Sequence, residues 1–426
     1  MAASRGLRTW SLMILLLAIM SVYSFDGVSL AVFFCYDSFM SNDHFAVALL
    51  PQQANDIFNN LVVAVLSGNL FFHHAAVLLV ALLVDFFIGD PVMVYKRLAH
   101  PVVVMGKWLL WLEQKLYPSS SHDRGRQLGL THPAAKTHHK GKKAVTSDVI
   151  FFMRGCLFLL LAIAPFLIFF FLPIAFSGDF SGWLYTWPFY PLVFLLIEVL
   201  LVAILLATNS LIRHVRAVAR DLERSTSAGQ RSLQKIVSRD ATKLDKYGVA
   251  RSALESLSEN FSDGVVAPAF YYFFFGLPGL LIYKMVNTAD SMVGYRNERY
   301  EWFGKAVARV DDLLNFVPAR FSALLYLVAG AVLAPRRLLA AVGVLWRDAA
   351  KHASPNSGWP EAALAGLLAV KIGGKRFYPG GIVKKQYIGA GRERVNARDI
   401  DKGINLTLLA FLSLWLTILV ILLMVK

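Results

Sequence analysis

Charged and amide side chains are concentrated in residues 287–315, between two segments that are apolar enough to lie in a membrane. A charged side chain that faces lipid costs roughly 2.5 to 3.5 kcal/mol on insertion scales, so these groups must face water, one another or a ligand. Carboxylates in such a setting can bind a cation or accept a proton, and arginines can bind phosphate or carboxylate. A structural network of salt bridges between helices is the alternative. The side chains are Asp290, Arg296, Asn297, Glu298, Arg299, Asp311, Asp312 and Asn315.

Helical spacing would place Asn287, Asp290 and Asn297 on one side of this segment. Lys284 precedes them, but it is not three or four residues from Asp290, so the two side chains would not lie directly above one another. Each is therefore free to contact a ligand rather than its neighbour.

A second acidic pattern lies in residues 238–268. Glu255, Glu259 and Asp263 recur every four residues, so a helix would carry three carboxylates on one stripe, with Asn260 beside them. Three acids on one face repel unless a cation or a basic group lies opposite, and Mg²⁺ typically takes one or two carboxylates together with substrate phosphates. A solvated helix face is the alternative. Asp240, in the same segment, is a secondary candidate.

Two further polar groups lie near predicted helix ends. In residues 85–109, Asp90 and His100 stand next to prolines, a pattern that also fits an ordinary helix terminus. In residues 354–374, Asn356, Trp359 and Glu361 lie at the start of a short apolar helix, where Glu361 could act only on the helix N-terminus. The sequence contains no P-loop, GxSxG, HExxH or GxGxxG motif.

The composition predicts the elements that must position these groups. The chain has 426 residues, 57% of them hydrophobic, and a mean hydropathy of +0.54. Its long uncharged runs reach the length of about 20 apolar residues that a membrane helix needs. The runs are 61–84, 151–176, 190–212 apart from Glu198, and 404–425.

Two other apolar segments are short or interrupted. Residues 265–283 contain Pro268, Gly276 and Pro278, and residues 321–335 end before two arginines, so we expect both to be re-entrant or half-spans. The predicted fold is therefore an all-α polytopic membrane protein. It would have about five full transmembrane helices, together with short broken or re-entrant helices and cytoplasmic amphipathic helices.

The net charge of +15 is concentrated in three polar segments, which the positive-inside bias assigns to the cytoplasm. The segments are 96–150, 213–263 and 371–402. Because topology explains this basic charge, nucleic-acid binding is not expected. The only cysteines, Cys35 and Cys156, are too few for a disulfide framework or a cysteine-based metal site.

The sequence suggests two parts. Residues 1–60 form an N-terminal extension that could act as a signal anchor, and residues 61–426 form the membrane domain. Within that domain we expect a mobile basic loop at 115–150, a cytoplasmic helical segment at 213–263, and polar motif segments at 284–320 and 346–402.

Five ordered strings give this chain a resemblance to a known family. They are GDP…HPV at 89–102, ENFSDGVVAP at 259–268, YKMVNTADSMVGYRNERY at 283–300, FGKAVARVDDLLNFVPAR at 303–320 and SPNSGWPEAA at 354–363. Together they resemble the CobD/CbiB membrane proteins of cobalamin biosynthesis, the adenosylcobinamide-phosphate synthases, over roughly residues 76–420. The first 70 residues have no counterpart in the family pattern, and the loop at 115–150 is longer than usual.

The resemblance implies an ATP-dependent amide ligase in the bacterial inner membrane, with its active site facing the cytoplasm. The enzyme would join aminopropanol phosphate, or aminopropanol, to the propionate carboxylate of adenosylcobyric acid, with ATP as co-substrate and Mg²⁺ as cofactor. Its partners would be these substrates, the lipid bilayer and other late cobalamin-assembly enzymes. The alternative is a non-catalytic corrinoid-binding membrane transporter or scaffold.

Roles are assigned on this basis as follows. Catalytic positions are Glu259, Asp263, Asp290 and Lys284, of which the three acids are also the candidate Mg²⁺ ligands. Substrate-binding positions are Asn260, Asn287, Arg296, Asn297, Arg299, Asn356, Trp359 and Glu361. Secondary candidates are Asp90, His100, Asp240, Asp311, Asp312 and Asn315.

Overall fold

The computed structural model describes residues 70–89, 95, 99–117, 142–177, 190–295, 299–378 and 381–424. Predictions for the extension at 1–60 and for most of the loop at 115–150 fall outside this part. The same holds for Asp90, Arg296, Asn297 and Glu298.

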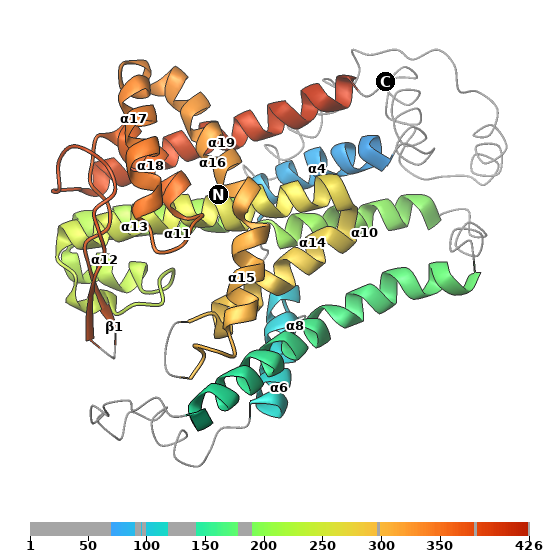
Figure 1. The fold of residues 1–426 in the computed structure, drawn as a ribbon. Coiled ribbons are helices and arrows are strands. Elements are labelled where there is room, and N and C mark those ends of the chain that lie inside the picture. Colours follow the sequence, from blue (N-terminus) through green and yellow to red (C-terminus); the bar gives the residue numbers. More distant parts are fainter. Residues whose placement is uncertain are drawn as a thin grey trace, which may run out of the picture.

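Helices make up nearly all of the described chain (Figure 1). They are α4 (Leu70–Phe87), α6 (Pro101–Leu116), α8 (Lys142–Ser177), α10 (Tyr190–Leu205), α11 (Thr208–Arg224), α12 (Thr226–Leu233), η2 (Ala241–Lys243), α13 (Lys246–Phe261), η3 (Ser262–Val266), α14 (Ala267–Val293), α15 (Lys305–Leu314), α16 (Phe316–Leu333), η4 (Pro335–Arg337), α17 (Leu338–Asp348), η5 (Ala349–Lys351), α18 (Gly358–Leu368) and α19 (Ala397–Met424). One antiparallel hairpin accompanies them, formed by β1 (Lys375–Tyr378) and β2 (Gly381–Lys384).

Six helical segments of the described chain are long and apolar enough to cross a membrane, which confirms the predicted all-α polytopic membrane class. They are Leu70–Phe87, Asp148–Phe169, Val193–Arg224, Lys246–Val293, Phe316–Leu333 and Ala397–Met424. Two local predictions differ from the structure. The expected half-span at 321–335 belongs to an 18-residue helix, α16. Residues 142–150 are the first turns of α8 rather than part of a loop.

The longest of these segments is not a straight span, because the chain folds back within α14. Gly276 has φ 61° and ψ −156°, a conformation that is essentially restricted to glycine. The rings of Tyr271 and Tyr283 stack with their centroids 5.0 Å apart, whereas twelve residues of straight helix extend about 18 Å. The Tyr283 hydroxyl also lies 3.0 Å from the backbone oxygen of Asp263. Residues 262–293 therefore form a re-entrant helical hairpin, as predicted for 265–283.

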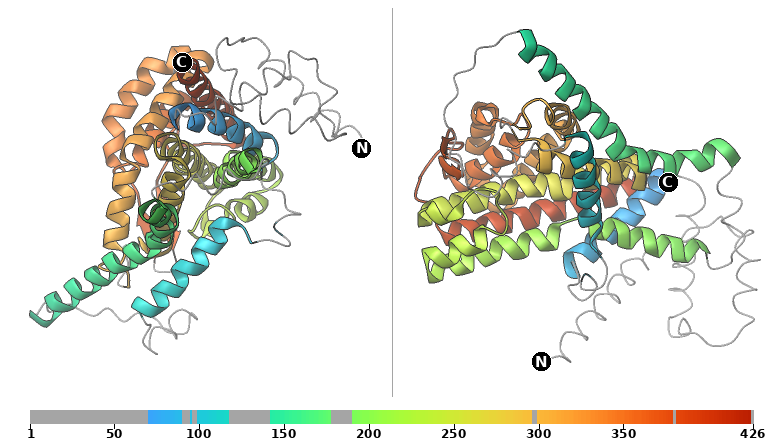
Figure 2. Two further views of the ribbon diagram at one scale, coloured as in Figure 1. Left: turned by 90° about the vertical axis from the view of Figure 1, so that its right-hand side faces the viewer. Right: turned by 90° about the horizontal axis from the view of Figure 1, so that it is seen from below.

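Six helices of the described chain pack against this hairpin (Figure 2): α4, α6, α8, α10, α15 and α16. Helix α19 contacts α4, α11, α13 and α16, and α14 contacts α4, α6, α8 and α15. Gly403 allows α13 and α19 to approach closely, since a Cβ there would lie 2.6 Å from Cδ2 of Leu254. The bundle thus holds both arms of the hairpin in place.

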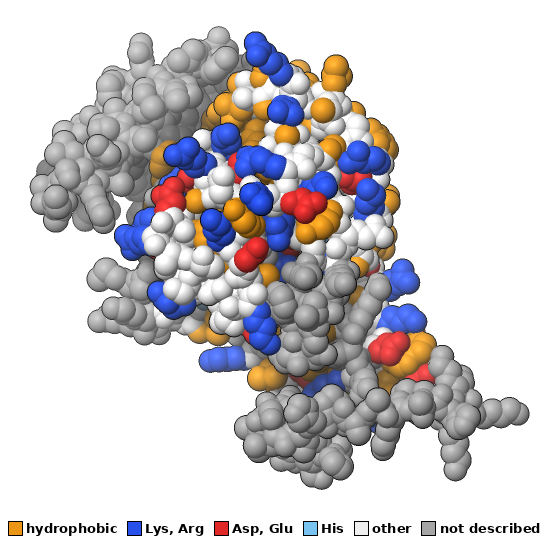
Figure 3. All heavy atoms as spheres, turned by 90° about the vertical axis from the view of Figure 1, so that its left-hand side faces the viewer, with side chains coloured by type: hydrophobic (Ala, Val, Ile, Leu, Met, Phe, Trp, Pro, Cys, Tyr) orange, Lys and Arg blue, Asp and Glu red, His pale blue; other side chains and the backbone are white. Residues whose placement is uncertain are grey.

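The surface separates apolar sides from a basic end. Large exposed hydrophobic side chains line α8, α10 and α16, as expected for surfaces that face lipid. Figure 3 shows Lys and Arg side chains gathered on the end of the molecule that carries α11, α12 and the β hairpin. Basic segments 213–263 and 371–402 therefore lie at one end, as one shared compartment would require.

Candidate functional site

Five carboxylates gather where the open end of the re-entrant hairpin meets α15. They come from α13, η3, α14 and α15. We call them the acidic cluster, which consists of Glu259, Asp263, Asp290, Asp311 and Asp312. Asp263 is repelled by Asp311, Glu259 and Asp290, and Asp290 is repelled by Asp311, Asp312 and Glu259. The hairpin explains this proximity, because its second arm returns Asp290 toward Glu259 and Asp263, which come before the first arm. The acidic cluster thus unites the two acidic patterns that the sequence singled out.

A π-helical turn positions Asp263 within the acidic cluster. The turn comprises Ser262–Val266 and joins α13 to α14, and such turns are frequent at functional sites. Its backbone is fixed from the other arm, where the buried Tyr283 hydroxyl contacts Asp263 O at 3.0 Å and Asn315 Oδ1 at 2.9 Å. Tyr283 therefore links the π turn to the start of α16.

Asp311 is held by two amide side chains. Asn315 Nδ2 donates to its Oδ2 at 3.0 Å, and Asn287 Nδ2 lies at the longer distance of 3.5 Å from its Oδ1. Burial raises the pKa of Asp311 to about 6, and the neighbouring Asp312 and Glu259 carboxylates add to this effect while the two amides oppose it. Asp311 is thus poised to gain or lose a proton near neutral pH.

Four members of the acidic cluster carry charge that no described basic side chain neutralises. Within the described residues, Glu259, Asp263, Asp290 and Asp311 form no salt bridge with a lysine, arginine or histidine. Mutually repelling carboxylates of this kind favour a bound cation or a ligand ammonium group.

The acidic cluster is not a closed metal cage. No group of three or more His, Cys, Asp or Glu side chains in the described residues is arranged to hold a metal ion. Glu259, Asp263 and Asp290 therefore do not form a preassembled three-ligand site. The arrangement fits Mg²⁺ held by one or two carboxylates with substrate phosphates as further ligands.

Glu255, the first acid of the predicted stripe, is separated from the acidic cluster. It is buried, accepts a hydrogen bond from Arg239 Nη2 at 2.7 Å, and accepts another from Gly373 N at 2.7 Å. A buried charge requires such a partner. Arg239 and Glu255 are 16 residues apart, so their spacing in the sequence does not predict the salt bridge. Glu255 thus ties α13 to the segment that leads into the β hairpin.

The loop before α18 closes one side of the acidic cluster. Asn356 Nδ2 donates to the backbone oxygen of Asp312 at 2.7 Å, and its Oδ1 accepts from Arg320 Nη1 at 3.1 Å. Ser357 Oγ donates to Glu259 Oε1 at 3.1 Å. The structure therefore brings the predicted substrate-binding residue Asn356 next to the predicted acids.

Sequence reasoning missed Arg320. Its guanidinium lies over the rings of Phe316 at 3.6 Å and Trp359 at 4.6 Å, so Trp359 supports a cation beside the acidic cluster. The available signal was its position at the end of the string FGKAVARVDDLLNFVPAR, four residues after Phe316.

Other predicted site residues have structural partners elsewhere. Arg299 Nη2 donates to Glu113 Oε1 at 2.8 Å, so its charge is used to neutralise a buried acid rather than left for substrate. His100 Nδ1 accepts from Val102 N and caps α6.

Asp240 likewise caps the short helix η2, where its Oδ1 accepts from Thr242 N at 3.0 Å. This local hydrogen bond gives Asp240 a structural role as a helix cap.

Two other predicted residues are buried, and a third is exposed at the end of α13. Lys284 is buried on α14, and Asn260 Nδ2 donates back to Ser256 O at 2.8 Å. Glu361 is buried in the first turn of α18, with its Oε1 3.7 Å from His352 Nε2. Glu361 thus belongs to a buried polar contact beneath the loop rather than to an open surface.

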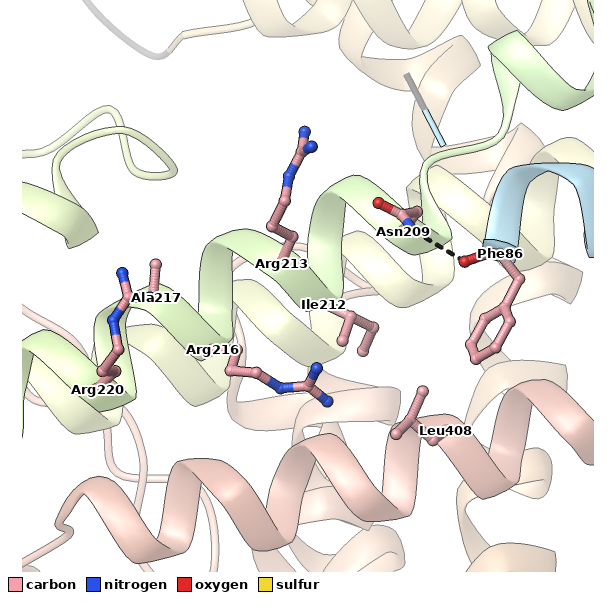
Figure 4. A pocket seen from close by; sticks show the side chains of 8 residues that line it. All are labelled: Phe86, Asn209, Ile212, Arg213, Arg216, Ala217, Arg220 and Leu408. Atoms are coloured by element: carbon pink, nitrogen blue, oxygen red, sulfur yellow. Dashed lines mark hydrogen bonds between the residues drawn. The ribbon is translucent and has the colours of Figure 1, made fainter. Parts of the chain in front are cut away.

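A cavity of about 420 Å³ lies apart from these residues (Figure 4). Its lining contains no member of the acidic cluster. The lining residues are Phe86, Asn209, Ile212, Arg213, Arg216, Ala217, Arg220 and Leu408.

Comparison with known proteins assigns the family. A family model described as "CobD/Cbib protein" matches residues 78–407, which include the acidic cluster and the loop before α18. The chain belongs to the CobD/CbiB family. It is 39% identical over 333 residues to "Cobalamin biosynthesis protein CobD" of Brucella suis, covering 78% of this chain and 91% of that protein.

Other CobD/CbiB relatives match to a similar extent. The chain is 42% identical over 332 residues to "Cobalamin biosynthesis protein CobD" of Sinorhizobium sp, which covers 77% of this chain and 92% of that protein. It is 37% identical over 333 residues to the protein of the same name from Rhodobacter capsulatus, with 78% and 92% covered. No solved structure matches the chain. The CobD/CbiB family predicted from the sequence strings is thus confirmed.

Proposed function

We propose that this CobD/CbiB member is the adenosylcobinamide-phosphate synthase of cobalamin biosynthesis, an ATP-dependent amide ligase. It would join aminopropanol phosphate, or aminopropanol, to the propionate carboxylate of adenosylcobyric acid. The names of its relatives support a role in this pathway. The observation that carries the reaction type is that four members of the acidic cluster, Glu259, Asp263, Asp290 and Asp311, form no salt bridge within the described residues, because the amine substrate is an ammonium ion and ATP is handled with a divalent cation.

Amide formation requires two steps that these residues suit. The propionate carboxylate attacks the γ-phosphorus of ATP, giving an acyl phosphate and ADP. The amine then attacks the acyl carbon, phosphate leaves, and a base removes the proton from nitrogen. We assign that base to the acidic cluster, with Asp290 and Asp311 as its candidates, since carboxylates that repel one another favour taking up a proton.

The remaining residues would bind and orient. Mg²⁺, when bound, would neutralise phosphate charge, held by one or two of Glu259, Asp263 and Asp290. Arg320 and Asn356 would contact anionic or amide groups of the corrinoid at the edge of the acidic cluster. Lys284, Asn287, Asn260, Trp359 and Glu361 stay candidates for substrate contact, as do Arg296 and Asn297 in the short segment outside the described residues.

We place the protein in the bacterial inner membrane with the acidic cluster facing the cytoplasm. The concentration of Lys and Arg at the end that carries α11, α12 and the β hairpin supports this orientation. ATP and the soluble substrates would then reach the open end of the re-entrant hairpin directly from the cytoplasm, where other late cobalamin-assembly enzymes could receive the product.

A second candidate is a corrinoid-binding transporter or scaffold without catalysis. It is favoured by polar groups at membrane depth beside the break in α14, where Glu198 accepts from Tyr272 at 2.7 Å and contacts His73 at 2.9 Å. Broken helices with polar surroundings are common in transporters.

One assay separates the two candidates. Purified protein is incubated with adenosylcobyric acid, aminopropanol phosphate and Mg-ATP, and the corrinoids are resolved by mass spectrometry, with ATP omitted as the control. A synthase gives the amide and one ADP for each product. Corrinoid that binds but is never amidated would instead support the transporter or scaffold.

A further inference from the structure

The cavity of Figure 4 lies between three helices. Phe86 lies at the end of α4, Ile212 and the three arginines lie on α11, and Leu408 lies on α19. Figure 4 shows Arg216 extending between α11 and α19 toward Ile212 and Leu408. The cavity thus combines an apolar floor with a basic rim.

Hydrogen bonds fix this junction. Asp85 Oδ2 accepts from Thr208 N at 2.8 Å, and Asn209 Nδ2 donates to Phe86 O at 2.8 Å. The end of α4 is therefore tied to the start of α11, and the cavity floor between them is preformed rather than assembled on binding.

Its location is the boundary between apolar and polar parts of one helix. The candidate span Val193–Arg224 begins with an uncharged run apart from Glu198, and its first arginine is Arg213, directly after Ile212. The arginines therefore start where the apolar run ends. In a bilayer, that position is the level of the lipid headgroups on the basic side.

The rim carries positive charge on one helix face. Arg213, Arg216 and Arg220 are exposed and follow one another at intervals of three and four residues, and in Figure 4 their guanidinium groups extend in different directions from α11. Within the described residues, Arg213 and Arg216 form no salt bridge, although Arg216 acts electrostatically on Asp401 of α19. Arg220 Nε lies 3.4 Å from Asp221 Oδ1, a contact that is open to solvent.

We propose that this cavity binds an anionic phospholipid. Its phosphate would lie beside Arg216, with Arg213 and Arg220 adding positive charge to the rim, and an acyl chain would run over Phe86, Ile212 and Leu408 toward the bilayer. A soluble phosphate ester would use the arginines alone and leave the apolar floor uncovered. A lipid uses both, because its charged and apolar parts meet at the same depth as those of the cavity.

Lipid retention tests this assignment on the full-length protein. Protein in dodecyl maltoside is titrated with phosphatidylglycerol or phosphatidylcholine, and bound lipid is measured by native mass spectrometry together with the melting temperature. Each juxtamembrane arginine changes affinity for anionic lipid by roughly 5-fold, so Arg213→Gln with Arg216→Gln should weaken phosphatidylglycerol binding roughly 30-fold. The matched control is Arg336→Gln with Arg337→Gln, which removes the same charge from exposed positions outside the cavity.

Three results would overturn the proposal. One is equal retention of the two lipids by the unchanged protein. Another is an equal loss of phosphatidylglycerol binding in the control variant, which would indicate a general charge effect. The third is stabilisation by millimolar inorganic phosphate that matches the effect of phosphatidylglycerol and is lost in the cavity variant, since the site would then take soluble phosphates.

Discussion

Replacing Asp311 by asparagine is expected to stabilise the folded protein above neutral pH while lowering its activity. Burial and neighbouring carboxylates raise the pKa of Asp311 from 3.8 to about 6. The protonated form therefore contributes stability that is fully present below about pH 3.8 and is lost as the pH rises through about 6. Asparagine keeps an acceptor for Asn315 but carries no charge at any pH.

The size of the effect follows from that difference. Each pKa unit corresponds to about 1.4 kcal/mol, so an ionised Asp311 destabilises the protein by roughly 3 kcal/mol at pH 8. The entropy of unfolding for a chain of 426 residues is on the order of 0.9 kcal/mol per kelvin, which converts this energy to about 3 °C in melting temperature.

The assay is thermal unfolding in detergent at pH 5 and pH 8, with amide formation measured on the same preparations. We expect Asp311→Asn to melt about 3 °C above the unchanged protein at pH 8 and by roughly half as much above it at pH 5. Asn287→Asp is the opposing control, because it adds a charge to the acidic cluster and should lower stability at pH 8. A variant that is no more stable at pH 8 than the unchanged protein would refute the reasoning about uncompensated charge.

Three further predictions concern the framework. Glu255→Gln should destabilise the protein by about 3 to 5 kcal/mol, seen as low membrane levels and a lower melting temperature, because it leaves Arg239 buried without its charged partner; unchanged stability would contradict this role. Gly276→Ala should cost about 1 to 3 kcal/mol and reduce activity, since its backbone conformation excludes a Cβ; a variant with normal activity and melting temperature would remove the need for the sharp fold-back. Single cysteines replacing Lys243 or Gln386, in a protein without its native cysteines, should resist an impermeant thiol reagent in intact cells, and labelling before lysis would reverse the proposed orientation.

Local sequence signals predicted the membrane class and the break in the apolar segment at 265–283. Pro268, Gly276 and Pro278 indicated a discontinuous helix, since such residues interrupt helical hydrogen bonding and are tolerated only where protein lines the gap. They could not indicate the direction of the returning arm. The fold-back that places Asp290 near Asp263 depends on tertiary contacts such as the stacking of Tyr271 on Tyr283.

The acidic residues of the candidate site were predicted from the sequence more accurately than its basic residues. Glu259, Asp263 and Asp290 converge, whereas Glu255, which has the same spacing, forms a salt bridge with Arg239. Arg299 is also taken, by Glu113. Which arginine neutralises which acid depends on packing between distant segments, so spacing along the chain could not identify these pairs or the position of Arg320.

The central claim is that the acidic cluster is the reaction centre of an ATP-dependent amide ligase. The most direct measurement is the initial rate of amide formation by purified Asp290→Asn, beside Glu301→Gln, which removes an exposed acid before α15. Loss of a group that stabilises charge at a reacting centre typically lowers the rate on the order of 100 to 1000-fold, so we predict that loss for Asp290→Asn at a melting temperature no lower than that of the unchanged protein. The control should stay within about 2-fold, as expected for a surface change. A folded Asp290→Asn protein that forms the amide at the unchanged rate would contradict the account.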